Sequence, residues 1–186
     1  ARFFPAESNE SYLWLLRKVL LSCGVPGAFC QHTQNAVLRR DRVWTIEEQL
    51  RGERDPTQVG RALRLLGIPQ YLESRHRVAS ITSLFSEFLD EALGGTASLT
   101  LQQANRLLDR KLIKLFNRRF RLAGSGIDKA WRPLPRNLDV ERVCSFHYDA
   151  CVLYNNKVIL GDIEIDIPPG QKRISYAKVP VEVRQL

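Results

Sequence analysis

Apolar residues recur at helical spacing near the start of the chain. Ser8 is a suitable N-cap, and the apolar stripe after it predicts a helix over residues 9–22. Gly24 and Pro26 come directly after this stripe, in the order that usually ends a helix. The short apolar run 28–31 then predicts a buried strand.

Two capping arrangements predict the next helices, each with a polar residue three positions after the cap: Thr45 with Glu48, and Asp55, before Pro56, with Gln58. They indicate a short helix and then a longer one that ends at Leu66 and is closed by Gly67. Residues 68–72 have the pattern of another strand. Helices that alternate with short apolar strands are typical of a mostly parallel, layered α/β domain.

Two longer helices are predicted in the middle of the chain. One covers residues 75–93 and ends at Gly94-Gly95, and the other begins at a Thr100 cap and runs to about Phe120. Core positions at helical spacing are expected at Val78, Ile81, Phe85, Phe88, Leu89 and Ala92 in the first helix, and at Ala104, Leu107, Leu108, Leu115 and Phe116 in the second.

The pattern changes beyond Ala123. Gly124-Ser125-Gly126 with Pro133 and Pro135 predicts a basic linker rather than a packed element. From Asp139 the period becomes two, which predicts strands at 143–148, 151–154, 157–160 and 162–167 and a further strand from 179. Asn155-Asn156 suits a hairpin turn with positive φ. A small antiparallel β-barrel would hide the edges of these strands. The alternating pattern continues up to Leu186, which leaves open whether this barrel is complete.

The net charge of +8, with a pI near 9.6, suits a polyanionic partner but also a merely soluble surface. From Gly94 to Asn137 the chain has ten Lys and Arg residues against two acids, so this segment accounts for the whole net charge. The ten are Arg106, Arg110, Lys111, Lys114, Arg118, Arg119, Arg121, Lys129, Arg132 and Arg136. Uncompensated cations bind phosphates through counterion release without contacting bases. The segment is therefore predicted to bind DNA, with a solvated helix face as the alternative.

Trp131 lies inside the basic linker, where it either stacks on nucleic acid or anchors the linker. The four cysteines, at positions 23, 30, 144 and 151, form no CxxC pair, which predicts buried free thiols in a reducing cytosol. No apolar run approaches the roughly 18 residues of a membrane span, and no signal peptide is visible. We therefore expect a cytoplasmic, nucleoid-associated protein with no membrane partner.

The segment AFCQHTQNAV at 28–37 resembles a stretch of bacterial insertion-sequence transposases of the retroviral-integrase (DDE) superfamily, in which a buried strand runs into Tyr/Ser/Thr-Asp-Arg/His-His-Ser-Val-Phe. Residues 44–68 match the same family in spacing, from WTIEEQL through DPTQVGRAL to LGI. FNRRF at 116–120 is similar to its Tyr/His-Asn-x-Arg-Phe motif. Residues 137–170 resemble the DNA-binding and assembly module that follows its catalytic domain. The resemblance spans about Phe3 to Leu186, and it adds Lys172 and Arg173 to the expected DNA contacts.

The same resemblance implies that catalysis has been lost. The family's second metal-binding Asp falls at His32, its final Glu falls at Thr82 within SRHRVASITSLF, and its first Asp should precede Ala1. Such transposases use divalent cations, normally Mg²⁺, to clamp the reacting oxygens. A neutral imidazole and a hydroxyl supply neither the charge nor the hard ligands that Mg²⁺ requires, and Asp41, Glu73 and Glu87 lie at other positions. No metal or other cofactor is expected.

The leading hypothesis is a truncated transposase derivative that binds DNA without strand transfer. It would have a ribonuclease-H-like integrase core lacking its first strands, with a trailing basic helix, over 1–122, a basic linker over 123–138 and a small β-barrel over 139–186. One alternative is an active DDE transposase whose acids lie outside the recognised positions. The other is an interaction module that regulates an intact transposase or forms an oligomer with itself.

Overall fold

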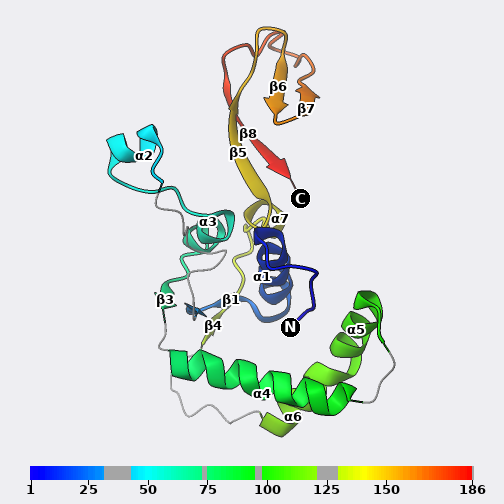
Figure 1. Cartoon of the computed structure of the whole chain (residues 1–186). Helices are drawn as coiled ribbons and strands as arrows, with labels where there is room; N and C mark the ends of the chain where they lie inside the picture. The colour runs from blue at the N-terminus through cyan, green and yellow to red at the C-terminus, as the bar shows by residue number, and fades with distance from the viewer. Residues whose placement is uncertain (32–42, 73–74, 95–97, 121–129, 186) are drawn as a thin grey trace. The chain divides into compact units, whose positions relative to one another are not determined.

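The computed structural model describes residues 1–31, 43–72, 75–94, 98–120 and 130–185 (Figure 1). The structure is mixed α/β, with helices and two-stranded sheets, and it divides into a first unit, Ala1–Cys144, and a second unit, Ser145–Leu186. The boundary therefore falls later than the predicted start of the C-terminal module at Asp139. None of the described helices has the length and apolar character needed to cross a membrane.

Helix α1 (Asn9–Cys23) begins at the predicted cap. The Ser8 hydroxyl accepts from the Ser11 N–H at 3.1 Å, and the Ser11 hydroxyl accepts from the Ser8 N–H at 3.1 Å. Gly24 ends the helix with φ 87°, and its N–H donates to the Leu20 carbonyl. A Cβ at Gly24 would collide with the Arg132 carbonyl oxygen, so both the backbone conformation and the space require glycine.

Helices α2 (Ile46–Arg51) and α3 (Gln58–Leu65) follow, and the predicted cap of the second was wrong. Thr45 caps α2 with the expected capping box. Thr57 caps α3, because Asp55 is engaged with α2: its N–H donates to the Glu48 carboxylate at 2.9 Å, and its carboxylate accepts from Arg51 at 2.9 Å. The cap therefore lies two residues beyond the predicted one.

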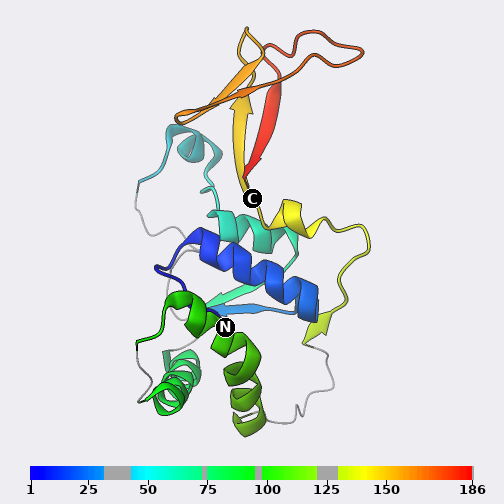
Figure 2. The ribbon, with the colours of Figure 1, turned by 90° about the vertical axis from the view of Figure 1, so that its right-hand side faces the viewer.

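The first unit contains two short sheets (Figures 1 and 2). Strand β1 (Val25–Pro26) pairs antiparallel with β4 (Trp131–Arg132), and β2 (Phe29–Gln31) pairs in parallel with β3 (Gln70–Leu72). The Gly27 N–H extends the first pairing by donating to the Ala130 carbonyl at 2.8 Å. Part of the predicted linker is thus a packed element, because residues 130–132 return to pair with β1. These two-stranded sheets do not confirm a ribonuclease-H-like sheet.

One apolar core of the first unit lies between α1, α3 and the short helix α7 (Val140–Val143). Its buried side chains are Leu13, Leu16 and Leu20 of α1, Val59, Ala62 and Leu63 of α3, and Val140 and Val143 of α7. The strand predicted to start at Val143 is wrong at this end, because Asp139 caps α7 by accepting from the Arg142 N–H at 3.0 Å. Figure 2 shows α1 and α3 on the same side of β2 and β3.

A second core joins α4 (Arg75–Leu93) to the continuous helix formed by α5 (Leu101–Leu107), the π turn η1 (Leu108–Leu112) and α6 (Ile113–Phe120). Phe88, Leu108 and Leu112 are buried at its centre, surrounded by partly buried aromatic and aliphatic side chains. Three predicted core positions are wrong: Ile81 is 64% exposed, Leu115 is 37% exposed, and Ala92 is exposed as well. Leu112 is buried instead of Leu115, since the residues facing α4 recur every fourth position.

The second unit is built from two antiparallel strand pairs. Strand β5 (Phe146–Cys151) pairs with β8 (Pro180–Gln185), and β6 (Lys157–Leu160) pairs with β7 (Ile163–Asp166). The strand predicted at 151–154 is wrong, because β5 ends at Cys151 and the chain turns before β6. Asn156 in that turn has the predicted positive φ, of 59°. The described strands form two separate sheets, so the predicted barrel is not confirmed.

Candidate nucleic-acid interface

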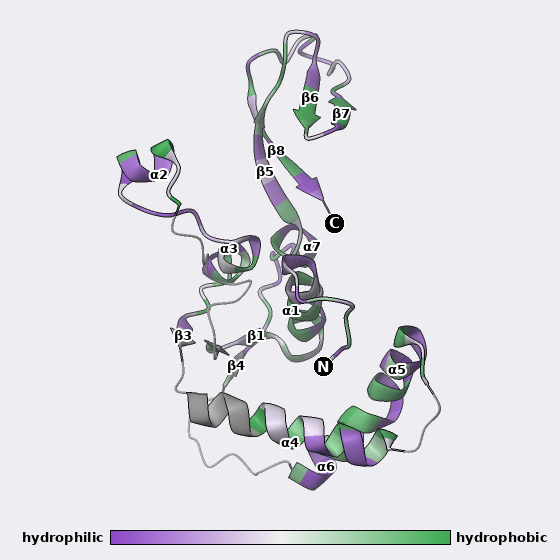
Figure 3. Cartoon of the chain, in the orientation of Figure 1, coloured by the Kyte–Doolittle hydropathy of each residue, from purple (hydrophilic) through white to green (hydrophobic). Residues whose placement is uncertain are grey.

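The helix from Leu101 to Phe120, called the basic helix below, carries most of the described candidate residues. Thr100 starts it with the predicted capping box, in which the Gln103 side chain accepts from the Thr100 N–H at 2.9 Å. Its six cations are exposed: Arg106, Arg110, Lys111, Lys114, Arg118 and Arg119. Asp109 is its single acid. Figure 3 shows hydrophilic and hydrophobic segments side by side along this helix, as an amphipathic surface requires.

Aromatic packing holds the basic helix against α4. The Phe116 ring meets Phe85 edge-on at a centroid distance of 5.0 Å and Phe88 at 5.4 Å. Phe120 completes the cluster, at 4.8 Å from Phe116 and 6.3 Å from Phe88. Edge-to-face pairs at these distances add to the stabilisation from apolar burial. The cluster therefore fixes which side of the basic helix faces the protein.

Polar contacts hold a neighbouring side of the basic helix. The buried Asn105 amide exchanges two hydrogen bonds with the backbone of Phe3: its oxygen accepts from the Phe3 N–H at 2.8 Å, and its nitrogen donates to the Phe3 carbonyl at 2.9 Å. Asp109 pairs with Lys18 of α1 at 2.6 Å. The one acid of the basic helix is thus neutralised by a cation from another helix.

Lys18 belongs to a second group of cations, which the sequence did not single out. Its ammonium lies 5.4 Å from the centre of the Trp14 ring, and the Arg2 guanidinium lies 4.0 Å from the same ring. Cation–π contacts of this kind hold the two cations against the ring. A pattern search along the chain misses this group, because its members come from the N-terminal segment and α1.

The cations of the basic helix differ in their partners. Arg119 donates to the Glu91 carboxylate of α4 at 2.7 Å. The other five have no hydrogen-bonding or ion-pair partner among the described residues: Arg106, Arg110, Lys111, Lys114 and Arg118. Exposed cations without a nearby acid are the groups that bind phosphate oxygens most readily.

The other candidate residues between Gly94 and Asn137 differ in their surroundings. The Arg132 guanidinium donates to the carbonyls of Leu66 at 3.2 Å and Gly67 at 3.1 Å, so it supports the C-terminal end of α3. Arg136 is exposed, whereas Arg121 and Lys129 lie outside the described residues. Trp131 is paired in β4 and lines an apolar cleft of about 250 Å³ beside α1 and α3, which favours its role as an anchor.

The two candidates in the second unit lie around its longest loop. Arg173 donates to the Ser175 carbonyl at 2.7 Å, and its guanidinium lies 5.3 Å from the Tyr176 ring centre. Lys172 is exposed.

The two positions at which the sequence resemblance places metal ligands supply no carboxylate. Thr82 is exposed on α4, and His32 lies outside the described residues. Within the described ranges, no group of three or more His, Cys, Asp or Glu side chains is placed to hold a metal ion. A hydroxyl at position 82 does not fit the hard, anionic ligand set of Mg²⁺.

The cysteines are free, but the prediction that they are buried was wrong, because none of the four is fully buried. Cys23, Cys30 and Cys151 are exposed, and Cys144 is half-buried. Burial, together with the neighbouring Glu141 carboxylate, raises the pKa of the Cys144 thiol to about 11. The thiol at Cys144 is therefore protonated at neutral pH and is a poor nucleophile.

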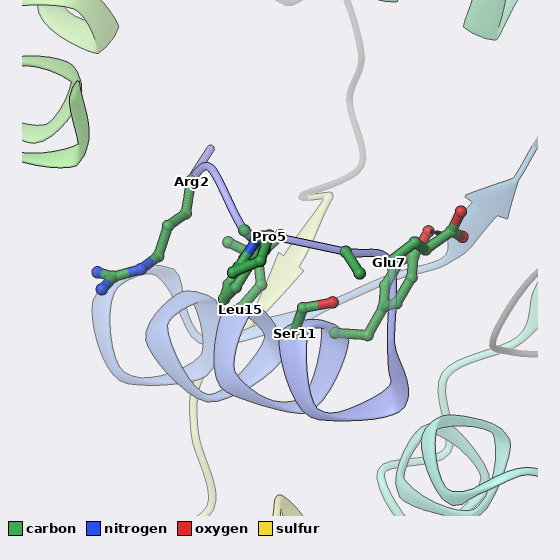
Figure 4. Close-up of a pocket in the computed structure, with 8 residues that line it drawn as sticks. Arg2, Pro5, Glu7, Ser11 and Leu15 are labelled. Carbon is green, nitrogen blue, oxygen red and sulfur yellow. Dashed lines mark hydrogen bonds between the residues drawn. The ribbon is translucent and has the colours of Figure 1, made fainter. Parts of the chain in front are cut away.

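An open groove of about 470 Å³ lies between the N-terminal segment and α1 (Figure 4). Figure 4 shows Pro5 and Leu15 facing each other across it, with Arg2 and Glu7 towards its two ends. The Glu7 carboxylate accepts from the Tyr12 hydroxyl at 2.9 Å, and the Ser11 hydroxyl is used in the cap of α1. These side chains form neither a nucleophile–base pair nor a charged cluster, so the groove suggests no reaction.

No protein-family model matches the chain, and neither a curated protein nor a solved structure matches it. The resemblance to DDE transposases therefore rests on the sequence motifs alone, and the assignment of a function rests on the basic helix.

Proposed function

We propose that this chain binds DNA through phosphate contacts of the basic helix, as a transposase derivative that does not carry out strand transfer. The carrying observation is the charge of this helix: six exposed cations accompany one acid, and that acid is paired with Lys18. Such a surface attracts a polyanion through counterion release and does not read sequence. The protein would act in the cytoplasm, on the nucleoid.

The proposal includes a ribonuclease-H-like arrangement of the first unit and a barrel-like closure of the second. The parallel pairing of β2 with β3, beside the packed helices α1 and α3, supports the former. The antiparallel pairing of β5 with β8 and of β6 with β7 supports the latter. The absence of strand transfer follows from the hydroxyl at Thr82 and the imidazole at His32, since neither replaces a carboxylate on Mg²⁺.

A salt titration tests DNA binding by the basic helix. On duplex DNA each contacted phosphate contributes about −0.9 to the slope of log K against log salt, so four to six contacts give a slope between about −3.6 and −5.4. Two duplexes of unrelated sequence should give the same slope. Replacing all six cations of the basic helix with Gln, which retains helix propensity, should remove most of the slope.

An unchanged slope in the six-fold variant would show that DNA binds elsewhere or that the helix face is merely solvated. The matched control is the K172Q/R173Q variant of the second unit, which should flatten the slope by no more than about two. With Mg²⁺ or Mn²⁺ added, the duplexes should stay uncut. Metal-dependent nicking that is lost in E87Q would instead favour an active transposase.

A second candidate function is that of an interaction module, and the apolar surface of the second unit favours it. Tyr154 and Ile174 are 79% and 80% exposed, and Ile159 and Ile163 are also largely exposed. Exposed apolar patches often mark protein interfaces. Sedimentation of the wild type and of I174D would test self-association: concentration-dependent association that I174D abolishes supports this function, and a monomer at all concentrations excludes self-association through this surface.

A further inference from the structure

The π turn in the basic helix has a geometric consequence for its cations. In a regular α-helix, every fourth residue falls about 40° further round the axis, so four such residues wind through about 120°. The turn from Leu108 to Leu112 is wider, with the Ile113 N–H donating to the Leu108 carbonyl five residues back. A wider turn rotates less per residue, which reduces the winding. Residues four positions apart in this helix therefore form nearly straight rows.

Three of these four rows face the protein. The row Leu108, Leu112, Phe116 and Phe120 forms the core with α4. On one flank, the row that contains Asn105 and Asp109 contacts Phe3 and Lys18. On the other flank, the row that contains Arg119 reaches Glu91 of α4, and Lys111 belongs to this row.

In the fourth row, Gln102 is followed by four consecutive cations: Arg106, Arg110, Lys114 and Arg118. Each of these residues lies two positions from a member of the core row, so the fourth row is opposite the core. All four side chains are exposed, and none has a partner among the described residues. The row spans about 18 Å, with steps of about 6 Å between cations.

We infer that this row follows the backbone of a single DNA strand, while Lys111 and Arg119 do not contact the DNA. The inference rests on the proposed function and specifies its site. Each strand of a duplex has a phosphate about every 3.4 Å of axis, so about 18 Å covers roughly five phosphates of one strand. A straight row on one side of a helix cannot reach both strands equally. The second strand is therefore dispensable, and single-stranded DNA is a ligand as well.

Two double variants test the row, and they remove the same charge from the same helix: K114Q/R118Q in the row and K111Q/R119Q on the flank. On duplex DNA, the row variant should flatten the salt slope by about 1.8, and the flank variant should leave it unchanged. On single-stranded DNA the wild-type slope should be about −2.8, from four contacts at about −0.7 each. Thermal melting checks that both variants fold, and R106Q/R110Q replaces the row variant if it does not.

Equal flattening by the row and flank variants would overturn the single-strand track and leave the proposed function standing. Failure of the wild type to bind single-stranded DNA, with duplex binding intact, would overturn it as well. Failure to bind either form would remove the proposed function together with the inference.

Discussion

The second unit and the basic helix both carry several cations, but only in the second unit do acids balance them in number. Residues 145–186 contain five Lys and Arg residues and five Asp and Glu residues. Lys157 pairs with Glu164 at 2.8 Å and with Asp166 at 3.7 Å, and Arg184 pairs with Glu182 at 2.7 Å. Hydrogen bonds from these two cations hold the pKa of Glu164 and that of Glu182 below their ordinary range.

The contrast shows that the balance between cations and acids matters more than the number of cations. On the basic helix the single acid is bound by Lys18, and only Arg119 among the six cations has a carboxylate partner in the described residues. The charge of this helix therefore remains available to a polyanion. The second unit is balanced, so its contribution to salt-dependent binding should be small.

The largest expected effect concerns the core that supports the basic helix. Phe88 is 7% exposed and contacts Phe85, Phe116 and Phe120. Phe88→Ala removes a buried ring and leaves a cavity, which should lower the free energy of unfolding by about 3 to 5 kcal/mol. Chemical denaturation followed by circular dichroism measures this loss.

The matched control for Phe88→Ala is Ile174→Ala in the second unit, at a side chain that is 80% exposed. This exposed change should stay within about 0.5 kcal/mol. A loss below about 1 kcal/mol at Phe88 would show that the aromatic cluster does not hold the basic helix in place, and the assignment of its free row would lose its support.

Local signals in the sequence predicted much of the fold. Ser8, Thr45 and Thr100 cap helices, as expected, because a cap involves residues only three positions apart. The helix predicted over 75–93 has those bounds. The pairing of β1 with β4 was not predictable in this way, because it joins residues more than a hundred positions apart. The π turn also escaped prediction, since its register depends on packing against α4.

The candidate site was predictable in composition but not in detail. The six cations of the basic helix stand out in the sequence. Which of them are free depends on distant residues: Lys18, which neutralises Asp109, is 91 positions away from it, and Glu91 is 28 positions from Arg119. Arg132 was predicted to contact DNA. Its actual partner, the carbonyl of Leu66, lies 66 positions away, so no local pattern in the sequence reveals the hydrogen bond.

A smaller effect is expected from the acid of the basic helix. Asp109→Asn removes one negative charge and releases Lys18, so the slope of log K against log salt should become steeper by about one. The matched control is Asp162→Asn in the second unit, at an exposed acid that gives the same change in net charge. Salt titrations of both variants make the comparison. Equal steepening by the two variants would mean that net charge, rather than the basic helix, controls binding.

The most direct test of the central claim is to measure the reactivity of each lysine towards an amine-modifying reagent, with and without duplex DNA. The full chain is modified first and then digested, and mass spectrometry quantifies the modification of each lysine. Lys114 lies in the free row, Lys111 on the flank, and Lys172 in the second unit, and all three are exposed. The predicted result is strong protection of Lys114 by DNA, with Lys111 and Lys172 reacting as they do in the free protein. Protection of Lys172 with no change at Lys114 would contradict the assignment of the basic helix as the DNA-binding surface.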